Sequence, residues 1–595
     1  MRSLKNEVLG YILWILFSNV LIYASFYYNW KEELIQRDYL IWTIMLVIVT
    51  LIVLWLNINK IKFLNGELKF SSLILTILTS LLVSFFYFGK SFLYEETGYW
   101  MVVNNIHYFL FISIFVFIYI VFSMEIFHIT KDIIIRKTKG IKRYNYHYIL
   151  LFIIQILILG IYFYGLNPGN MSYDTYNQVN QLKGIISYNT WHPIGHTLFM
   201  GLLLKIWNNY AIITIFQILF FAAVTTSFYR FLLKYKVKWQ LVYFTAIIMV
   251  AIPSVGINLV TQWKDIPFTI GLLWGTLILF KMNIEENYFQ KPIKAVEFAL
   301  CLLSISLFRF NGILAFITMI VYAFGYVLRK KYMKRNLYIS IAFVLTIFFV
   351  INVVVPKYLN AVPNPPGMKL RPIYQGYAGI YIAGKEESLK EESQNLIETV
   401  SSPEQIHDFY NPYFADTIST NTPNFLNNLS KIKTPAALKI YLEAFIIHPE
   451  IILGDKFNLS VSMWSVTADR FSYNNAYTTA IQKEMIEEFG VERNENKLTE
   501  IINKFAIFTF TENYLLNTLV WRTGFYLSLE FVLLLYLILK KDRRISLFIP
   551  LLCNGVIVFL TMPAQDYRYL WFIFLLFPFL ALACSVDLKN KNQPN

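Results

Sequence analysis

Side chains that could transfer a proton gather in the stretch from Asn167 to Thr197. This stretch holds a single carboxylate, Asp174, together with polar side chains that could bind a ligand beside it: Tyr173, Gln178, His192 and His196. A carboxylate near an apolar surface is partly desolvated, which favours its protonated form. Such a group can act as a general base toward a hydroxyl. The alternative reading is that Ser172 or Asp174 only caps the helix that follows.

Three further polar breaks interrupt apolar sequence, at residues 262–267, 308–312 and 564–569. Each carries at least one ionisable side chain, and a separate Leu-Arg-Pro element, residues 370–372, adds one more. The side chains are Lys264, Asp265, Arg309, Arg371, Asp566 and Arg568. Arginine binds a phosphate group as a two-pronged fork and lysine binds it as a point charge. A single charge at a membrane boundary can equally be an interface anchor, since long side chains reach water, or part of a salt bridge between loops. The convergence of all four breaks would favour a binding site.

His192 and His196 lie four residues apart and are predicted to share one face of a helix. Such a pair could hold a metal ion, but no glutamate flanks it as in zinc proteases. We therefore expect no metal and no cofactor, although a divalent cation stays an open alternative. Cys301, Cys553 and Cys584 are far apart in apolar runs, which argues against disulfides and thiolate metal sites.

The elements that position these residues are membrane helices. The chain is 57% hydrophobic and 15% charged, and its apolar residues form runs of roughly 18 to 25, which indicates an all-α polytopic membrane protein. The net charge of +15 is spread over short loops and forms no continuous basic face, so we expect no nucleic-acid partner. The abundance of Ile, Lys and Asn fits a bacterium with an AT-rich genome.

The apolar runs predict about 14 transmembrane helices. Their ranges are 9–28, 39–58, 70–89, 107–126, 147–165, 210–232, 240–259, 267–283, 294–308, 311–328, 336–355, 516–539, 545–561 and 569–586. The run from Ile194 to Trp207 is too short to cross, and we interpret it as a helix lying along the outer surface. With that choice every strongly basic loop faces the cytoplasm, as the positive-inside rule requires. Both termini are then cytoplasmic, and the Asp174 loop is extracytoplasmic in the plasma membrane.

The same topology divides the chain into four parts. Residues 1–130 form an N-terminal extension of four transmembrane helices, and residues 131–355 form a core whose external loop, 166–209, carries Asp174. Residues 356–515 form an extracytoplasmic domain that is mainly helical. Residues 516–595 supply the C-terminal transmembrane helices, with Glu530 inside one of them; this carboxylate is either functional or a contact between helices.

The order of Asp174, His192-Pro193 and Asp265 resembles that of the GT-C superfamily of membrane glycosyltransferases, which includes protein O-mannosyltransferases and the aminoarabinose transferases of lipid A. Those enzymes have a catalytic acidic residue in the first large external loop, then juxtamembrane helices, then a second acidic residue. The Trp-Lys-Asp and Asp-Tyr-Arg-Tyr elements are similar to those of uncharacterised bacterial members. The resemblance covers about residues 147 to 590. The chain departs from it by four added N-terminal helices, by a single acidic residue at Asp174 and by His-Pro in place of Pro-Pro.

The resemblance implies transfer of a sugar from a polyprenyl-phosphate donor to an extracytoplasmic acceptor, with Asp174 and Asp265 as catalytic residues. The implied acceptor is a cell-envelope glycan, a teichoic-acid-like polymer or a protein, and membrane lipids surround the enzyme. The arginines and Lys264 would stabilise the phosphate leaving group without a metal. Two alternatives stay open: a transporter or flippase of lipid-linked glycans, and a glycan polymerase or ligase.

Overall fold

The structure is a computed structural model that describes residues 70–88, 116–117, 120–121, 124, 144–328, 334–466 and 476–586. Over these ranges the chain is helical, and extended residues pair only in isolated bridges, without a β-strand. The prediction of an all-helical chain is confirmed for this part of the protein.

Within the same ranges, seven helices are long and apolar enough to cross a membrane, or up to nine if two bent pairs count as single spans. This confirms a helical protein with several membrane-spanning candidates. The predicted total of about 14 spans stays a prediction, because spans 9–28, 39–58 and most of 107–126 lie outside the described residues. The helices of the bundle are α4 (Phe70–Phe88), α6 (Tyr144–Gly165), α9 (Ala211–Lys234), α10 (Trp239–Ala251), α11 (Pro253–Leu259), α12 (Asp265–Ile284), α13 (Pro292–Phe308), α14 (Ile313–Leu328), α15 (Lys334–Phe349), α27 (Tyr514–Trp521), α28 (Thr523–Leu539), α29 (Ile549–Thr561) and α30 (Tyr567–Ser585).

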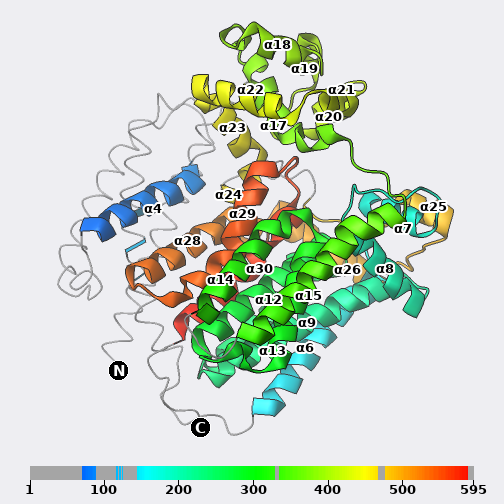
Figure 1. Ribbon diagram of the computed structural model, residues 1–595. Helices are drawn as coiled ribbons and strands as arrows, with labels where there is room; N and C mark the ends of the chain where they lie inside the picture. Colours follow the sequence, from blue (N-terminus) through cyan, green and yellow to red (C-terminus); the bar gives the residue numbers. More distant parts are fainter. Residues whose placement is uncertain are drawn as a thin grey trace.

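Helix α12 lies at the centre of this bundle (Figure 1), packed against α9, α13, α29 and α30. It is apolar on every side and almost all of its residues are buried, as expected for a helix surrounded by other helices. Asp265 is its first residue and Lys264 directly precedes it. The central helix therefore presents both charged side chains at one end of the bundle.

Two predicted spans are bent instead of straight. Helices α10 and α11 meet at 63°, and α27 and α28 meet at 64°. At the first bend, Pro253 forces Ile252 into an extended conformation, since proline disfavours a helical residue before it. At the second bend, Arg522 itself is extended. Helix α13, predicted as a span, carries Lys294 and Glu297 and is not among the spanning candidates.

Helix α8 (Ile194–Ile206) is a 13-residue apolar helix, shorter than the roughly 20 residues that a crossing requires. Its position along an outer surface stays a prediction. The helix begins after Pro193, so His192 lies outside it. The two histidines therefore do not share a helix face as predicted, because proline disfavours a helical conformation of the residue before it and α8 starts only at Ile194.

A small helical domain, at the top of Figure 1, has a hydrophobic core of its own built from residues between Leu370 and Ile452. Its longer helices are α17 (Arg371–Ile382), α18 (Glu391–Glu398), α19 (Pro403–Phe409), α20 (Asp416–Asn421), α21 (Phe425–Lys431), α22 (Thr434–Ile447) and α23 (Pro449–Leu459). The backbone N–H of Ala415 donates to the Pro563 carbonyl at 2.8 Å, and Phe414 pairs with Ala564. The domain thus rests on the loop that leads into α30.

The chain after α23 returns to the bundle through α24 (Val461–Trp464), α25 (Lys483–Phe489) and α26 (Lys497–Ile507). Val461, Trp464 and Ile502 belong to the main hydrophobic core, whereas Met485 packs with Met171 and Val179 around α7 (Tyr173–Leu182). These segments therefore support the loop that carries Asp174.

Candidate active site

The loop before Asp174 is fixed by hydrogen bonds on two sides. The Asn170 N–H donates to the Val260 carbonyl at 2.8 Å, and the Gln262 N–H donates to the Asn170 carbonyl at 2.9 Å. On the other side, Met171 donates to the Ala480 carbonyl at 3.1 Å and its own carbonyl accepts from the Gln482 N–H at 2.8 Å. Segments distant in sequence therefore hold this loop like the middle strand of a very short sheet.

Arg493 adds a clamp on the same loop. Its Nη2 donates to the carbonyls of Leu166 and Gly169, at 3.2 and 3.1 Å, and to Oδ1 of Asn170 at 2.8 Å, while Nη1 donates to the Thr479 carbonyl. Only a planar group with several N–H donors can satisfy so many acceptors at once. Sequence reasoning missed Arg493, because the residue stands in a charged segment with no motif around it.

Asp174 stands in the first turn of α7, where Ser172 occupies the N-cap position without making a side-chain cap. The Ser172 hydroxyl instead accepts from Nε1 of Trp263 at 2.8 Å, and Thr175 donates to the Gln262 carbonyl at 3.0 Å. Neither Ser172 nor Asp174 therefore acts as a helix cap. The explanation of Asp174 as a helix cap is thus removed, and its carboxylate is directed toward other side chains.

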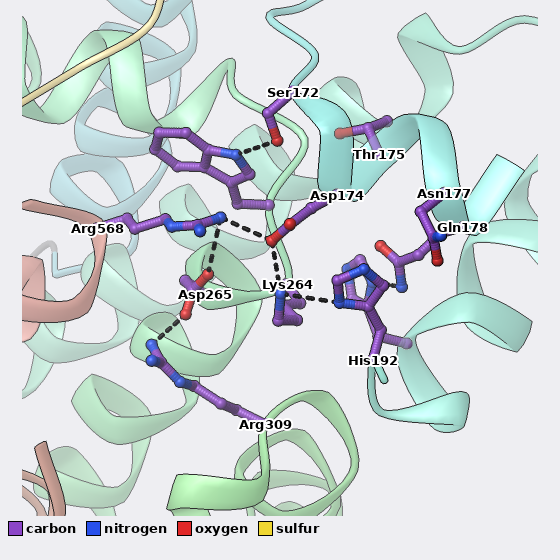
Figure 2. Close-up of polar contacts among 12 residues, drawn as sticks. Ser172, Asp174, Thr175, Asn177, Gln178, His192, Lys264, Asp265, Arg309 and Arg568 are labelled. Atoms are coloured by element: carbon purple, nitrogen blue, oxygen red, sulfur yellow. Dashed lines mark hydrogen bonds and ion pairs between the residues drawn. The ribbon is translucent and has the colours of Figure 1, made fainter. Parts of the chain in front are cut away.

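The Asp174 carboxylate faces two cations (Figure 2). Its Oδ2 accepts from Nζ of Lys264 and from Nη1 of Arg568, each at 2.7 Å. The lysine stands at the start of α12 and the arginine in the first turn of α30. The starts of two bundle helices, α12 and α30, thus meet the loop helix α7 at a single oxygen atom.

Arg568 also connects Asp174 with two other carboxylates. Its Nη1 lies 4.0 Å from Oδ2 of Asp265, and its Nη2 lies 3.3 Å from Oδ2 of Asp566. Asp265 is fully buried and its Oδ1 accepts from Nη1 of Arg309 (Figure 2). The structure therefore brings residues from all four predicted polar breaks into one charged cluster, which we call the ion cluster: Asp174, Lys264, Asp265, Arg309, Asp566 and Arg568.

Aromatic rings hold the arginines of the ion cluster in place. The guanidinium of Arg568 lies 5.0 Å from the ring centres of both Trp263 and Tyr569, and that of Arg309 lies 4.5 Å from the Tyr569 ring. Arginine stacks favourably on such rings. Trp263 is buried and was missed as a site residue, although it stands beside Lys264 in the sequence.

The two histidines lie on the α8 side of the ion cluster. Nδ1 of His192 is 3.2 Å from Nζ of Lys264, and since lysine can only donate, the proton of the neutral ring resides on Nε2. His196 is further back, where its Nδ1 is 3.0 Å from Nε2 of Gln178, which also donates to Thr197 at 2.9 Å. His192 therefore contacts the ion cluster directly. Gln178 and His196 contact each other and, within the described part of the chain, form no hydrogen bond with the cluster's charged side chains.

The charges in this cluster set its protonation states. Burial alone would raise the pKa of Asp174, but the charges of Lys264 and Arg568 outweigh it and hold that pKa well below its ordinary value. Burial and the charge of Lys264 lower the pKa of His192 to about 3, and burial with the same lysine lowers that of His196 to about 3. Burial raises the pKa of Asp566 above its ordinary value. At neutral pH Asp174 is thus ionised and both histidines are neutral.

Two predicted site residues lie apart from the ion cluster. Tyr173 is 59% exposed and its ring lies 5.8 Å from that of Tyr176. Arg371 begins α17 in the small domain, where it forms an ion pair with Asp416. It also interacts electrostatically with Tyr569, so it lies near the cluster without joining its hydrogen bonds.

Glu530 is buried in α28, and neither of its carboxylate oxygens has a hydrogen-bond partner among the described residues. The Arg522 side chain, which precedes Glu530 by about two helical turns, donates from Nε to Oδ1 of Asn517 at 2.7 Å. Glu530 therefore does not belong to the ion cluster.

Among the residues that the structure describes, no three His, Cys, Asp or Glu side chains are grouped so that they could hold a metal ion. No protein-family model, curated protein or solved structure matches this chain. The class that its fold defines is a helical protein with several apolar helices long enough to cross a membrane.

Proposed function

We propose that the protein is a membrane glycosyltransferase that moves a sugar from a polyprenyl-phosphate donor to a cell-envelope acceptor. The observation that carries the proposal is the ion cluster itself, in which three cations and three carboxylates from four chain segments meet at one end of an apolar bundle. A lipid-linked substrate offers an anionic phosphate at such a boundary and an apolar tail beside it. The acceptor would be a glycan, a teichoic-acid-like polymer or a protein.

In this reaction Asp174 takes the proton of an acceptor hydroxyl, and the acceptor oxygen bonds to the anomeric carbon. The bond from that carbon to the phosphate oxygen breaks, and its electron pair leaves with the polyprenyl phosphate. Lys264, Arg309 and Arg568 stabilise the leaving anion, since preorganised charges commonly supply the largest part of catalysis. Asp265 positions Arg309 and lies beside Arg568, so its role is to orient the cations.

The placement of charge supports catalysis at a surface over transport. A transporter or flippase needs polar groups along a path near mid-membrane. The six charged side chains of the ion cluster stand instead at helix ends: in the first turn of α7, at the start of α12, directly after α13 and at the start of α30. A polymerase or ligase shares the substrate class, and the length of the product on a gel distinguishes it from single-sugar transfer.

The test is the Asp174→Asn variant, assayed for sugar transfer in membranes. We expect a loss of about 100- to 10,000-fold, the usual contribution of a general base, with unchanged expression and membrane insertion. The matched control is Glu488→Gln, which removes an exposed carboxylate bonded to the Tyr176 hydroxyl and should leave the rate unchanged. Near-normal transfer by Asp174→Asn would exclude this residue as the base.

The proposal places the ion cluster on the extracytoplasmic side of the plasma membrane, with both termini in the cytoplasm. Ser187 is exposed in the loop between α7 and α8. A cysteine at this position should react with a membrane-impermeant thiol reagent added to intact cells. Labelling only after the cells are opened would reverse the orientation.

A further inference from the structure

The base of the proposed reaction is engaged by cations in the structure. Oδ2 of Asp174 accepts from both Lys264 and Arg568 at 2.7 Å. A carboxylate between two positive charges binds a proton weakly, so it is a poor base in this state. The same contacts occupy the two cations that would receive a phosphate.

The ion cluster also has no surplus positive charge. Three cations, Lys264, Arg309 and Arg568, face the three carboxylates Asp174, Asp265 and Asp566. An arriving phosphate must therefore replace one carboxylate as the counter-ion of a cation, because an added uncompensated anion would be repelled.

Asp174 is the carboxylate best able to move aside. The exposed fraction of its side chain is 22%, compared with 0% for Asp265 and 13% for Asp566. Asp265 is the first residue of the buried helix α12, whereas Asp174 projects from the loop helix α7.

The two cations have other contacts that would keep them in place. Lys264 donates to His192, and Arg568 rests on the rings of Trp263 and Tyr569 and contacts Asp566. Loss of the Asp174 contact would therefore leave both cations oriented toward the same volume.

We propose that the donor phosphate displaces Asp174 from Lys264 and Arg568, so that the carboxylate becomes a competent base only after the donor has bound. This inference rests on the proposed function. The phosphate oxygens take over the N–H donors of both cations, and neutralising these cations restores the proton affinity of Asp174. The freed carboxylate then accepts the proton of the acceptor hydroxyl as described above. Donor binding thus precedes acceptor activation.

The test compares the affinity of the purified full-length protein for farnesyl phosphate, a short polyprenyl monophosphate without a sugar. Asp174→Asn removes the competing charge and should bind it roughly tenfold more tightly, a difference of about 1.4 kcal/mol. Asp174→Glu keeps the charge and should bind like the wild type. Lys264→Met should weaken binding about tenfold, and Glu488→Gln should leave it unchanged.

Equal or weaker binding of farnesyl phosphate by Asp174→Asn overturns the inference. Weaker binding would be expected, for example, if Asp174 held a divalent cation that bridges to the phosphate. If Asp174→Asn does not fold, Asp174→Ser removes the same charge and is compared by the same measurement. The proposed function fails separately if the wild-type protein transfers no sugar, although the variants change the affinity for farnesyl phosphate as expected. Loss of transfer with unchanged affinity in Asp174→Asn removes only the displacement step.

Discussion

Nη1 of Arg568 lies 2.7 Å from Oδ2 of Asp174, although the two residues are 394 positions apart in the chain. The contact joins a short loop helix to the first turn of α30. It is the longest connection in sequence within the ion cluster, and Arg568 contacts all three of the cluster's carboxylates: Asp174, Asp265 and Asp566.

Replacement of Arg568 by lysine should therefore be severe even though the charge is kept. Lysine offers one ammonium group and cannot contact several carboxylates while stacked between Trp263 and Tyr569. We expect Arg568→Lys to lower sugar transfer at least about 100-fold, the scale of losing one preorganised donor. Transfer rates in membranes measure this, with Lys483→Arg, a change at an exposed residue, as the control. A loss below threefold would show that charge alone suffices.

Arg493 should act on the same reaction from a distance. It donates to three acceptors in the loop before Asp174 and to the Thr479 carbonyl, and none of these acceptors belongs to the ion cluster. Arg493→Gln should lower stability by about 1–3 kcal/mol, because buried carbonyls lose their donors. Transfer should fall mainly through kcat as Asp174 loses its position. A normal melting temperature together with normal transfer would show that the loop does not need this clamp.

The neutral histidines predict a stability that depends on pH. His192 and His196 have an ordinary pKa of 6.5 and a folded-state pKa of about 3, so the unfolded chain binds more protons between these values. Stability should therefore fall as pH decreases from about 6.5 toward about 3, by about 1 kcal/mol per histidine and pH unit. Melting temperatures of the wild type and of His192→Gln with His196→Gln measure this. An equally steep decline in the double variant would assign the effect to other groups.

Gly169 should be far less replaceable than another glycine nearby. Its φ is +124°, and a Cβ at this position would lie 2.9 Å from the Val260 carbonyl oxygen and would also meet the Thr214 hydroxyl. Gly184 has a φ of +72° with nothing within 4 Å of an added Cβ. Gly169→Ala should thus reduce folding yield and transfer, whereas Gly184→Ala should cost about 1 kcal/mol. Similar behaviour of both variants would contradict the crowding argument.

The sequence allowed the helical class and the composition of the ion cluster to be predicted, for an identifiable physical reason. Charged residues are rare between apolar runs, so Asp174, Lys264, Arg309 and Arg568 stand out where helices end. That their ends meet follows from the packing of the bundle around α12. Span lengths were less predictable, because the bends at Ile252 and Arg522 depend on local backbone conformation.

The pairing within the cluster could not be predicted from the sequence. Asp174 was predicted to be a general base with a partly desolvated carboxylate, yet its carboxylate accepts from two cations whose charges outweigh its burial. Arg371 was expected among the phosphate ligands, but it pairs with Asp416, the first residue of α20 in the same small domain. Such choices depend on distances of a few ångströms between elements, which spacing along the chain does not contain.

The separation between Asp174 and Arg568 also has a consequence for biosynthesis. At about 5–20 residues per second of translation, roughly 20 to 80 s pass between the synthesis of these two residues. Lys264 is synthesised early in this interval and can already pair with Asp174. Arg309 follows soon after and can pair with Asp265. The last described helix, α30, therefore completes the ion cluster on insertion, and a ribosome that stalls before it leaves a membrane-inserted chain without its central arginine.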